Sequence, residues 1–458
     1  MEQSIGEIAR RVRQSELTAS ASIEAALAAA EENVALNAFI TLDREGALAR
    51  ARSLDALADR GEASGVLAGV PLVVKDNIDV AGLRTTAGTP AIDYVPTASA
   101  PVVARLEAAQ AIVIGKTNMH ELAFGVTSNN GAFGAVRNAA DPSRIPGGSS
   151  GGTATAVAAG IAPGGLGSDT AGSVRLPAAL CGVVGFRPTT WRVDQAGVVP
   201  SVPSFDVVGP IARCVADAAI LYNVMTGDPL PERRDPSRLR LGVARPYGED
   251  LSPGVAAALK QALEKLRTAG AILLDIDLSQ IAKDSFEIGF PVGFYEMKRA
   301  LPDFLARHQP KTSLHEVVEK IASPDVKAVY LNAVLGDGAP SETAYRDAIS
   351  RIEGVRRSYL KLLDAHGLDG VVFPTAPLEA QPIEGSNETV ELNGQALPTL
   401  QAYMRNVAST GVYGAPGLSL PLKTGAQALP VGLEVDGRPD GDRELLSIGL
   451  TLEGALSG

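Results

Sequence analysis

The chain has 458 residues, of which 45% are hydrophobic and 20% charged, and its formal net charge is −11. A single large α/β enzyme can account for this length. The negative charge argues against a nucleic-acid partner, because phosphate binding needs a basic surface. No stretch approaches about 18 uninterrupted apolar residues, so we expect no membrane partner. The first residues lack a secretory signal pattern, and we expect a cytoplasmic protein.

Metal and disulfide chemistry find little support in the sequence. The four histidines, His120, His308, His315 and His366, do not fall in a metal-binding spacing, and no CxxC occurs. The two cysteines, Cys181 and Cys214, stand in apolar settings typical of reduced core residues. We therefore predict neither a metal site nor a cofactor.

The first half of the chain changes from helical to mixed character. Residues up to about 60 are rich in Ala, Glu and Arg and are predicted to be helical. Short apolar runs at 70–74 and 111–114 predict buried strands that end near Lys75 and Lys116, with a helix at 101–109 between them. Ligands usually bind at this end of the strands in α/β sheets.

The second half is predicted to be mostly helical over residues 215–370, with an amphipathic window at 254–266. This segment could cover the sheet and line a pocket, or simply form core and surface. Its aromatic residues include Phe286, Phe290, Phe294, Tyr295, Phe304 and Tyr330. Runs at 371–377, 414–421 and 429–434 are predicted to rejoin the sheet. We expect one α/β domain over residues 1–458, with helices on both faces of a large mixed, twisted sheet.

The first serine- and glycine-rich stretch is Pro-Gly-Gly-Ser-Ser-Gly-Gly at 146–152, followed by a small-residue helix at 153–159. A flexible linker would be longer, and a phosphate loop would need a lysine after the glycines. The stretch also matches GxSxG, centred on Ser149 and on Ser150. That motif requires a strand directly before it. Pro146 argues against such a strand here.

The second stretch, at 167–173, places consecutive small residues beside Ser173. Their backbone N–H groups suit an oxyanion hole, although a tight turn would use the same residues. A serine nucleophile also needs a base. Lys75 and Lys116 are both candidates, and Asp76 could instead pair with Lys75, so the residue pattern alone leaves the base open.

Together these segments resemble the amidase signature family of Ser–Ser–Lys amidohydrolases. The resemblance covers nearly the whole chain, is weakest in the middle helical segment and has its core at 61–190. It is carried by residues 69–77, 115–119, 146–152, 167–177, 182–188 and 429–433.

The resemblance implies a catalytic role for three residues. Ser173 would be the nucleophile, Ser149 a bridging serine preceded by a cis peptide bond, and Lys75 the base, while Lys116 falls outside the catalytic positions. No metal or cofactor is implied. The oxyanion hole would consist of the N–H groups of Thr170, Ala171, Gly172 and Ser173.

Residues 117–125 and 127–134 indicate the substrate preference. Their sequence most resembles that of bacterial indoleacetamide and mandelamide hydrolases and aryl amidases. The expected partner is a small amide with an aromatic part, and Ala123, Phe124 and Ser128 are expected to lie near it. Ala171 stands where the family usually has glycine, which leaves specificity open. Alternatives are a glutamine-hydrolysing A subunit of a tRNA-dependent amidotransferase and a non-catalytic binding protein. A homodimer is left open.

Overall fold

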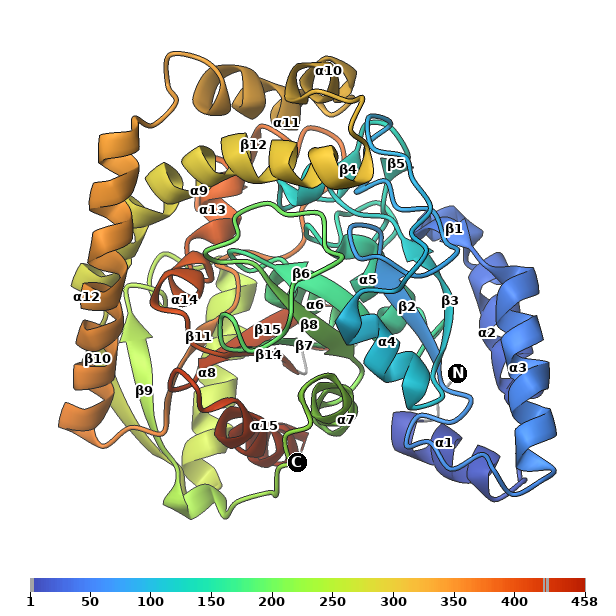
Figure 1. The fold of residues 1–458 in the computed structure, drawn as a ribbon. Coiled ribbons are helices and arrows are strands. Elements are labelled where there is room, and N and C mark those ends of the chain that lie inside the picture. Colours follow the sequence, from blue (N-terminus) through green and yellow to red (C-terminus); the bar gives the residue numbers. More distant parts are fainter. Residues whose placement is uncertain (1–3, 423–424, 426–427, 458) are drawn as a thin grey trace.

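The computed structural model describes residues 4–422, 425 and 428–457, and its centre is an 11-stranded mixed sheet (Figure 1). The strand order is β1-β3-β2-β6-β8-β7-β14-β15-β11-β9-β10. In that order the strands are Phe39–Leu42, Ile112–Thr117, Pro71–Lys75, Gly164–Asp169, Val207–Ala212, Val184–Arg187, Gly417–Leu422, Val431–Asp436, Gly370–Pro374, Arg240–Arg245 and Ile272–Asp277. Two small ribbons pair β4 (Asn129–Asn130) with β5 (Gly134–Ala135) and β12 (Thr389–Leu392) with β13 (Gln395–Pro398).

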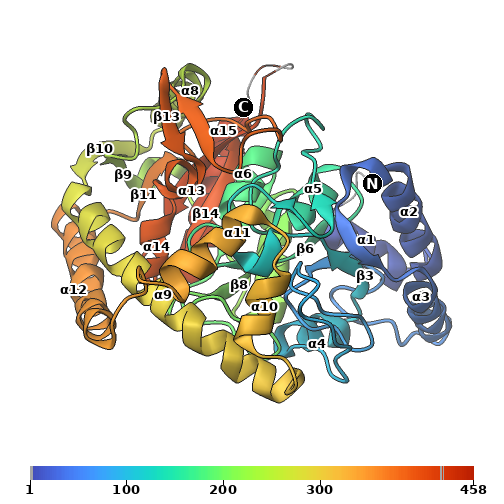
Figure 2. The same ribbon diagram turned by 90° about the horizontal axis from the view of Figure 1, so that it is seen from above.

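Helices surround this sheet, and the two orthogonal views separate them into groups (Figure 2). Helices α1 to α3 lie at one end of the molecule, and α9 to α12 lie together at another side. The α-helices α1 to α8 are Ile5–Arg13, Ala19–Glu32, Arg44–Ala58, Pro101–Ala108, Gly151–Ala158, Arg175–Cys181, Val215–Thr226 and Pro253–Thr268. Helices α9 to α15 are Ser279–His308, Leu314–Lys320, Pro324–Val329, Glu342–His366, Thr399–Met404, Ala408–Tyr413 and Asp442–Ser457. Short helical turns are η1 (Val34–Leu36), η2 (Glu121–Ala123), η3 (Pro236–Arg238) and η4 (Tyr330–Val334).

The central strands are buried on both faces because helices pack on each side. On β14 and β15, Leu418 and Leu433 join the core formed with α7, α8 and α15. The alternating residues face α6 instead, where Arg175 contacts Glu434. This two-residue alternation is what a pleated strand imposes.

Three parallel strands position the site. β2 pairs with β3 on one side and β6 on the other, with Lys75 opposite Thr117. Because parallel strands end at the same edge, Lys75, Thr117 and Asp169 come to one edge of the sheet. The predicted α/β fold with a large mixed sheet and surrounding helices is confirmed.

Two segment predictions are too helical. The segment before residue 60 contains the edge strand β1, and residues 215–370 contain β9 and β10. These strands lie at or next to the sheet edges, and β10 is largely exposed, so they are less distinct in the sequence than the fully buried central strands. Among the described residues, no helix is both long and apolar enough to span a bilayer.

Candidate active site

Lys75 is the last residue of β2 and is fully buried. Its Nζ lies 2.7 Å from Ser149 Oγ and 2.8 Å from Ser168 Oγ. A neutral amine has two hydrogens and one lone pair. Ser168 can accept both hydrogens, through its Oγ and through its carbonyl oxygen at 3.4 Å, which leaves the lone pair for the Ser149 hydroxyl proton.

The electrostatic environment of Lys75 favours that neutral form. Burial lowers the pKa of Lys75 to about 7, against the opposing effects of Asp169 and Asp206. The amine forms its hydrogen bonds with Ser149 and Ser168 rather than with either carboxylate. A substantial fraction of Lys75 is therefore unprotonated near neutral pH, as a general base requires.

The alternative pairing of Lys75 with Asp76 is wrong. Asp76 lies in the turn that follows β2, and its carboxylate is 3.5 Å from Lys116 Nζ. Lys116 also donates to Thr85 Oγ1 at 3.0 Å, while Asp76 accepts the N–H of Thr86 at 2.9 Å. All of these side chains are buried, so Lys116 and Asp76 form an internal ion pair beside the Lys75 site.

Ser149 and Ser150 occupy different environments on the loop that enters α5. The Gly148–Ser149 peptide bond is cis, as the resemblance implies, and the Ser149 carbonyl accepts the N–H of His120 at 3.1 Å. Ser150 is fully buried, and its Oγ bonds to the backbone of Ser168 rather than facing the pocket. No strand precedes this loop, which removes the structural context that a GxSxG nucleophile needs.

Ser173 follows the loop between β6 and α6 and lies half-buried on the wall of the pocket. The N–H of Ser150 donates to the Ser173 carbonyl at 3.2 Å, so the two serine-rich loops are directly joined. Gly172 has φ +112°, and a Cβ there would lie 2.3 Å from Val407 Cγ2. The position therefore requires glycine.

Of the four N–H groups predicted for the oxyanion hole, one already has another partner. The Gly172 N–H donates to Asp169 Oδ1 at 2.8 Å and is therefore already occupied. Thr170, Ala171 and Ser173 all line the pocket, and their N–H groups stay the predicted donors. The extra methyl group of Ala171 lies on this wall and leaves its N–H in place.

Asp169 holds the loop that carries Ser173 in place. It also accepts the N–H of Val174 at 3.2 Å and forms ion pairs with Arg175 and Arg187 at 3.0 and 2.9 Å. Burial alone would raise the pKa of Asp169, but the two arginines more than offset this and hold it below its ordinary value. The carboxylate thus stays charged and holds the loop rigid.

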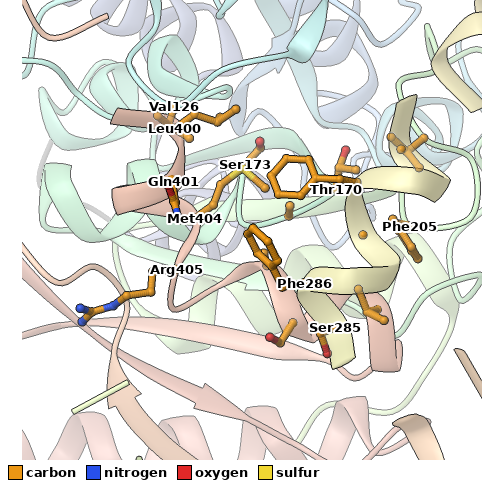
Figure 3. Close-up of a pocket in the computed structure, with 18 of the residues that line it drawn as sticks. Val126, Thr170, Ser173, Phe205, Ser285, Phe286, Leu400, Gln401, Met404 and Arg405 are labelled. Atoms are coloured by element: carbon orange, nitrogen blue, oxygen red, sulfur yellow. The ribbon is translucent and has the colours of Figure 1, made fainter. Parts of the chain in front are cut away.

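A pocket of about 260 Å³ opens from Ser173 (Figure 3). One wall comes from α9, where residues three and four apart share a face. This wall comprises Ser285, Phe286, Gly289, Phe290, Gly293 and Phe294. Phe290 packs against Phe286 and Phe294, with ring centroids 5.1 and 5.5 Å away, and Phe124 lies 6.3 Å from Phe294. The pocket is therefore mostly apolar and rich in aromatic rings.

The predicted pocket residues divide into two groups. Ala123 and Phe124 line the pocket, and Ala123 has φ +57°. Ser128 does not line it: its buried Oγ donates to the Gly147 carbonyl at 2.8 Å and accepts the Gly151 N–H at 3.2 Å. Ser128 instead supports the Ser149 loop from behind.

The aromatic residues of the middle segment also divide. Phe286, Phe290 and Phe294 face the pocket, whereas Phe304 and Tyr330 are buried in the core and Tyr295 stacks on Tyr345. The functional residues that the sequence did not point to are Ser168 and Asn77. Asn77 Nδ2 donates to Ser168 Oγ at 3.1 Å, and this arrangement depends on the pairing of β2 with β6.

Comparisons with known proteins find relatives that match nearly the whole chain. The family model described as Amidase matches residues 21–446. An indoleacetamide hydrolase from Agrobacterium vitis is 39% identical over 99% of this chain and 97% of its own length. A mandelamide hydrolase from Pseudomonas putida is 38% identical, covering 99% and 92%. The A subunit of a glutamyl-tRNA(Gln) amidotransferase from Koribacter versatilis is 36% identical, covering 93% and 92%. The native peptide amidase from Stenotrophomonas maltophilia superposes with a TM-score of 0.86 at 29% identity, covering 100% of this chain and 97% of that one.

Proposed function

The chain belongs to the Amidase family of amide hydrolases, and we propose that it hydrolyses small amides with an aromatic acyl or amine part through an acyl-enzyme on Ser173. One observation carries this proposal. A buried lysine with a lowered pKa contacts the Ser149 hydroxyl at 2.7 Å, beside an aromatic pocket on which Ser173 lies. These are the parts that nucleophilic catalysis by a serine requires.

The first half of the reaction forms the acyl-enzyme. Ser173 Oγ attacks the amide carbonyl carbon, and its proton passes to Ser149 while the Ser149 proton passes to Lys75 Nζ. The carbonyl oxygen gains negative charge, which the N–H groups of Thr170, Ala171 and Ser173 stabilise. The carbon–nitrogen bond then breaks, and the protonated Lys75 returns a proton through Ser149 to the leaving amine or ammonia.

The second half releases the acid. Water attacks the ester carbonyl, and the same two residues take one of its protons. The bond to Ser173 Oγ then breaks, and that oxygen regains a proton through Ser149. Lys75 ends each cycle neutral, so the relay needs no other acid or base.

The composition of the pocket supports an aromatic acyl group over glutamine. Glutamine carries a charged α-carboxylate, which a binding site normally pairs with a cation. Arg405 is the cation among the described pocket residues, and its guanidinium donates to the carbonyls of Glu249 and Asp250 at 2.9 and 3.3 Å. Figure 3 shows that guanidinium directed away from Ser173.

A panel of amides tests the substrate class. We expect the isolated chain to hydrolyse indoleacetamide, mandelamide or an anilide with a higher kcat/KM than glutamine. Ammonia or amine release measures each rate. A glutaminase activity above all aromatic amides would instead support the amidotransferase alternative.

Covalent labelling tests the nucleophile and separates an enzyme from a binding protein. A fluorophosphonate should label the wild-type chain at Ser173, and Ser173→Ala should abolish the label. Ser150→Ala is the matched control, because Ser150 is fully buried behind the site and its replacement should leave labelling intact. Labelling at Ser150, or no labelling of wild type, would overturn the assignment.

The cytoplasmic location and the homodimer stay predictions. Both cysteines are free, and Cys181 is buried, which supports a reducing compartment. Subcellular fractionation measures the location, and light scattering measures the oligomeric state.

A further inference from the structure

Ser285 is an unusual pocket residue because its hydroxyl is buried without a partner. The side chain is on α9, is 3% exposed and lines the pocket. Among the described residues, no group forms a hydrogen bond with its Oγ. A buried hydroxyl without a partner costs free energy, and serines in helices normally bond to the carbonyl four residues earlier or to solvent. The unused oxygen therefore points to a ligand.

The position of Ser285 identifies which part of a substrate it would meet. Figure 3 places Ser285 on the far side of Phe286 from Ser173. A substrate with its amide carbon at Ser173 would lay its ring among the phenylalanines. The edge of the ring that lies away from the amide would then approach Ser285.

Two other hydroxyl groups on the pocket wall, those of Thr170 and Tyr247, already have partners. Thr170 Oγ1 donates to Asp206 at 2.5 Å. The Tyr247 hydroxyl donates to Ser409 Oγ at 2.8 Å on α14, which packs against α9. Ser285 is thus the buried hydroxyl that remains unsatisfied, among the described residues of a wall that is otherwise apolar.

We propose that Ser285 Oγ is a specificity-determining group that accepts a hydrogen bond from a ring N–H or O–H of the substrate, on the side away from the scissile amide. This inference rests on the proposed aromatic amidase activity. Because no described group forms a hydrogen bond with Ser285 Oγ, its lone pairs are available to a donor on the ligand. The site would therefore favour aromatic amides with a polar ring edge over apolar rings of the same shape.

A pair of nearly isosteric substrates tests the proposal. Indole-3-acetamide has a ring N–H that benzothiophene-3-acetamide lacks. We expect wild type to prefer the indole amide by about 5–10-fold in kcat/KM, the range of one net hydrogen bond. Ser285→Ala should remove this preference by slowing the indole amide while the benzothiophene amide is hydrolysed at nearly the wild-type rate.

Two serine variants complete the experiment. Ser201 also lines the pocket and is 7% exposed, so Ser201→Ala tests a competing hydroxyl. Ser279 is exposed at the start of α9, and Ser279→Ala should retain the wild-type preference.

The outcomes separate the inference from the proposed function. Loss of the preference in Ser285→Ala alone supports the assignment. No preference in wild type, or a preference that survives in Ser285→Ala, overturns it while aromatic amidase activity stands. Failure of wild type to hydrolyse either amide overturns the proposed function itself, and the Ser285 assignment falls with it.

Discussion

The site joins two regions of opposite character. The residues proposed for catalysis and those that hold them form one region, which we call the catalytic floor (Lys75, Ser149, Ser168, Asp169 and Ser173). The other is an aromatic wall (Phe286, Phe290 and Phe294 on α9). The floor is polar, and its loops are tied by hydrogen bonds and ion pairs to β2, β6 and α6. The wall is apolar, and Phe286 remains 56% exposed. Changes in the floor should therefore affect every amide, whereas changes in the wall should alter the choice among amides.

A second comparison lies within the floor, between Lys75 and Lys116. Both lysines are fully buried at the ends of neighbouring parallel strands. Burial lowers the pKa of both amines, but Asp76 opposes this effect at Lys116. Lys75 bonds to hydroxyl groups instead. The same residue type is thus suited to accept a proton at one strand end and to balance a buried charge at the other.

The largest expected effect is on Lys75. Replacing it in Lys75→Met removes the proton acceptor and should lower kcat by about 10²–10⁴-fold for aromatic and aliphatic amides alike. Steady-state kinetics on at least two amides measures this change. A loss confined to one substrate would assign Lys75 to binding rather than to proton transfer.

Lys116→Met is the matched variant and should affect stability more than chemistry. It leaves the buried Asp76 carboxylate without its cation, which should lower the free energy of unfolding by about 3 kcal/mol. Denaturant unfolding measures this loss, and kcat is referred to the folded fraction. The double variant Asp76→Asn/Lys116→Met removes both charges and should recover part of the stability. A Lys116→Met protein that is fully folded yet as inactive as Lys75→Met would contradict the division of roles.

The pH dependence sharpens the contrast further. With the pKa of Lys75 at about 7, kcat/KM should fall about tenfold per pH unit below that value, because the protonated amine cannot act as a base. Since the ordinary pKa is 10.5, the unfolded chain binds a proton that folded Lys75 lacks between about pH 7 and 10.5. This group therefore makes the free energy of unfolding rise with pH over that window, and the contribution is constant below it.

Two measurements check these signs. A kcat/KM profile from about pH 3.5 to 9 gives the acidic limb, and urea unfolding of wild type and Lys75→Met at several pH values gives the contribution to stability. The free energy of unfolding of wild type should rise relative to that of Lys75→Met as the pH rises above about 7. An acidic limb centred near the ordinary carboxyl pKa, about 4, would point to a carboxylate instead.

The sequence predicts a catalytic lysine at a strand end, but local pattern alone does not choose between Lys75 and Lys116. Both follow buried apolar runs. The strand ends at Lys75, and Asp76 lies in the turn that follows it. The true partner of Asp76 comes from β3, far along the chain, through the pairing of two strands.

Pocket residues are harder to predict than the catalytic floor. The family resemblance places Ser128 near the substrate, yet the path of its loop directs the hydroxyl beneath Ser149. Ser285 lies in an ordinary helical window, and nothing local marks its hydroxyl as unpaired. Both properties depend on how distant segments pack. Short motifs with a distinct residue pattern can be recognised in the sequence. The wall of a pocket is formed by distant segments and can be identified only from the tertiary structure.

The smallest effect is expected on the aromatic wall, where Gly289→Ala tests whether the wall governs selectivity. A Cβ there would lie 4.0 Å from Val412 Cγ2, an ordinary contact, so the methyl group takes its space from the pocket. Alanine in a helix interior is more favourable than glycine by about 0.5–1 kcal/mol, so stability should rise. Overpacking should nevertheless lower kcat/KM for a bicyclic aromatic amide by about tenfold, with little effect on acetamide.

Gly354→Ala provides the control for this prediction. Gly354 lies in α12, and a Cβ there would meet nothing within 4 Å. It should give a similar gain in thermal stability and no change in the ratio of the two kcat/KM values. If Gly289→Ala slowed both amides equally, the change on α9 would be disturbing the catalytic floor. That result would contradict the assignment of substrate selectivity to the wall and of chemistry to the floor.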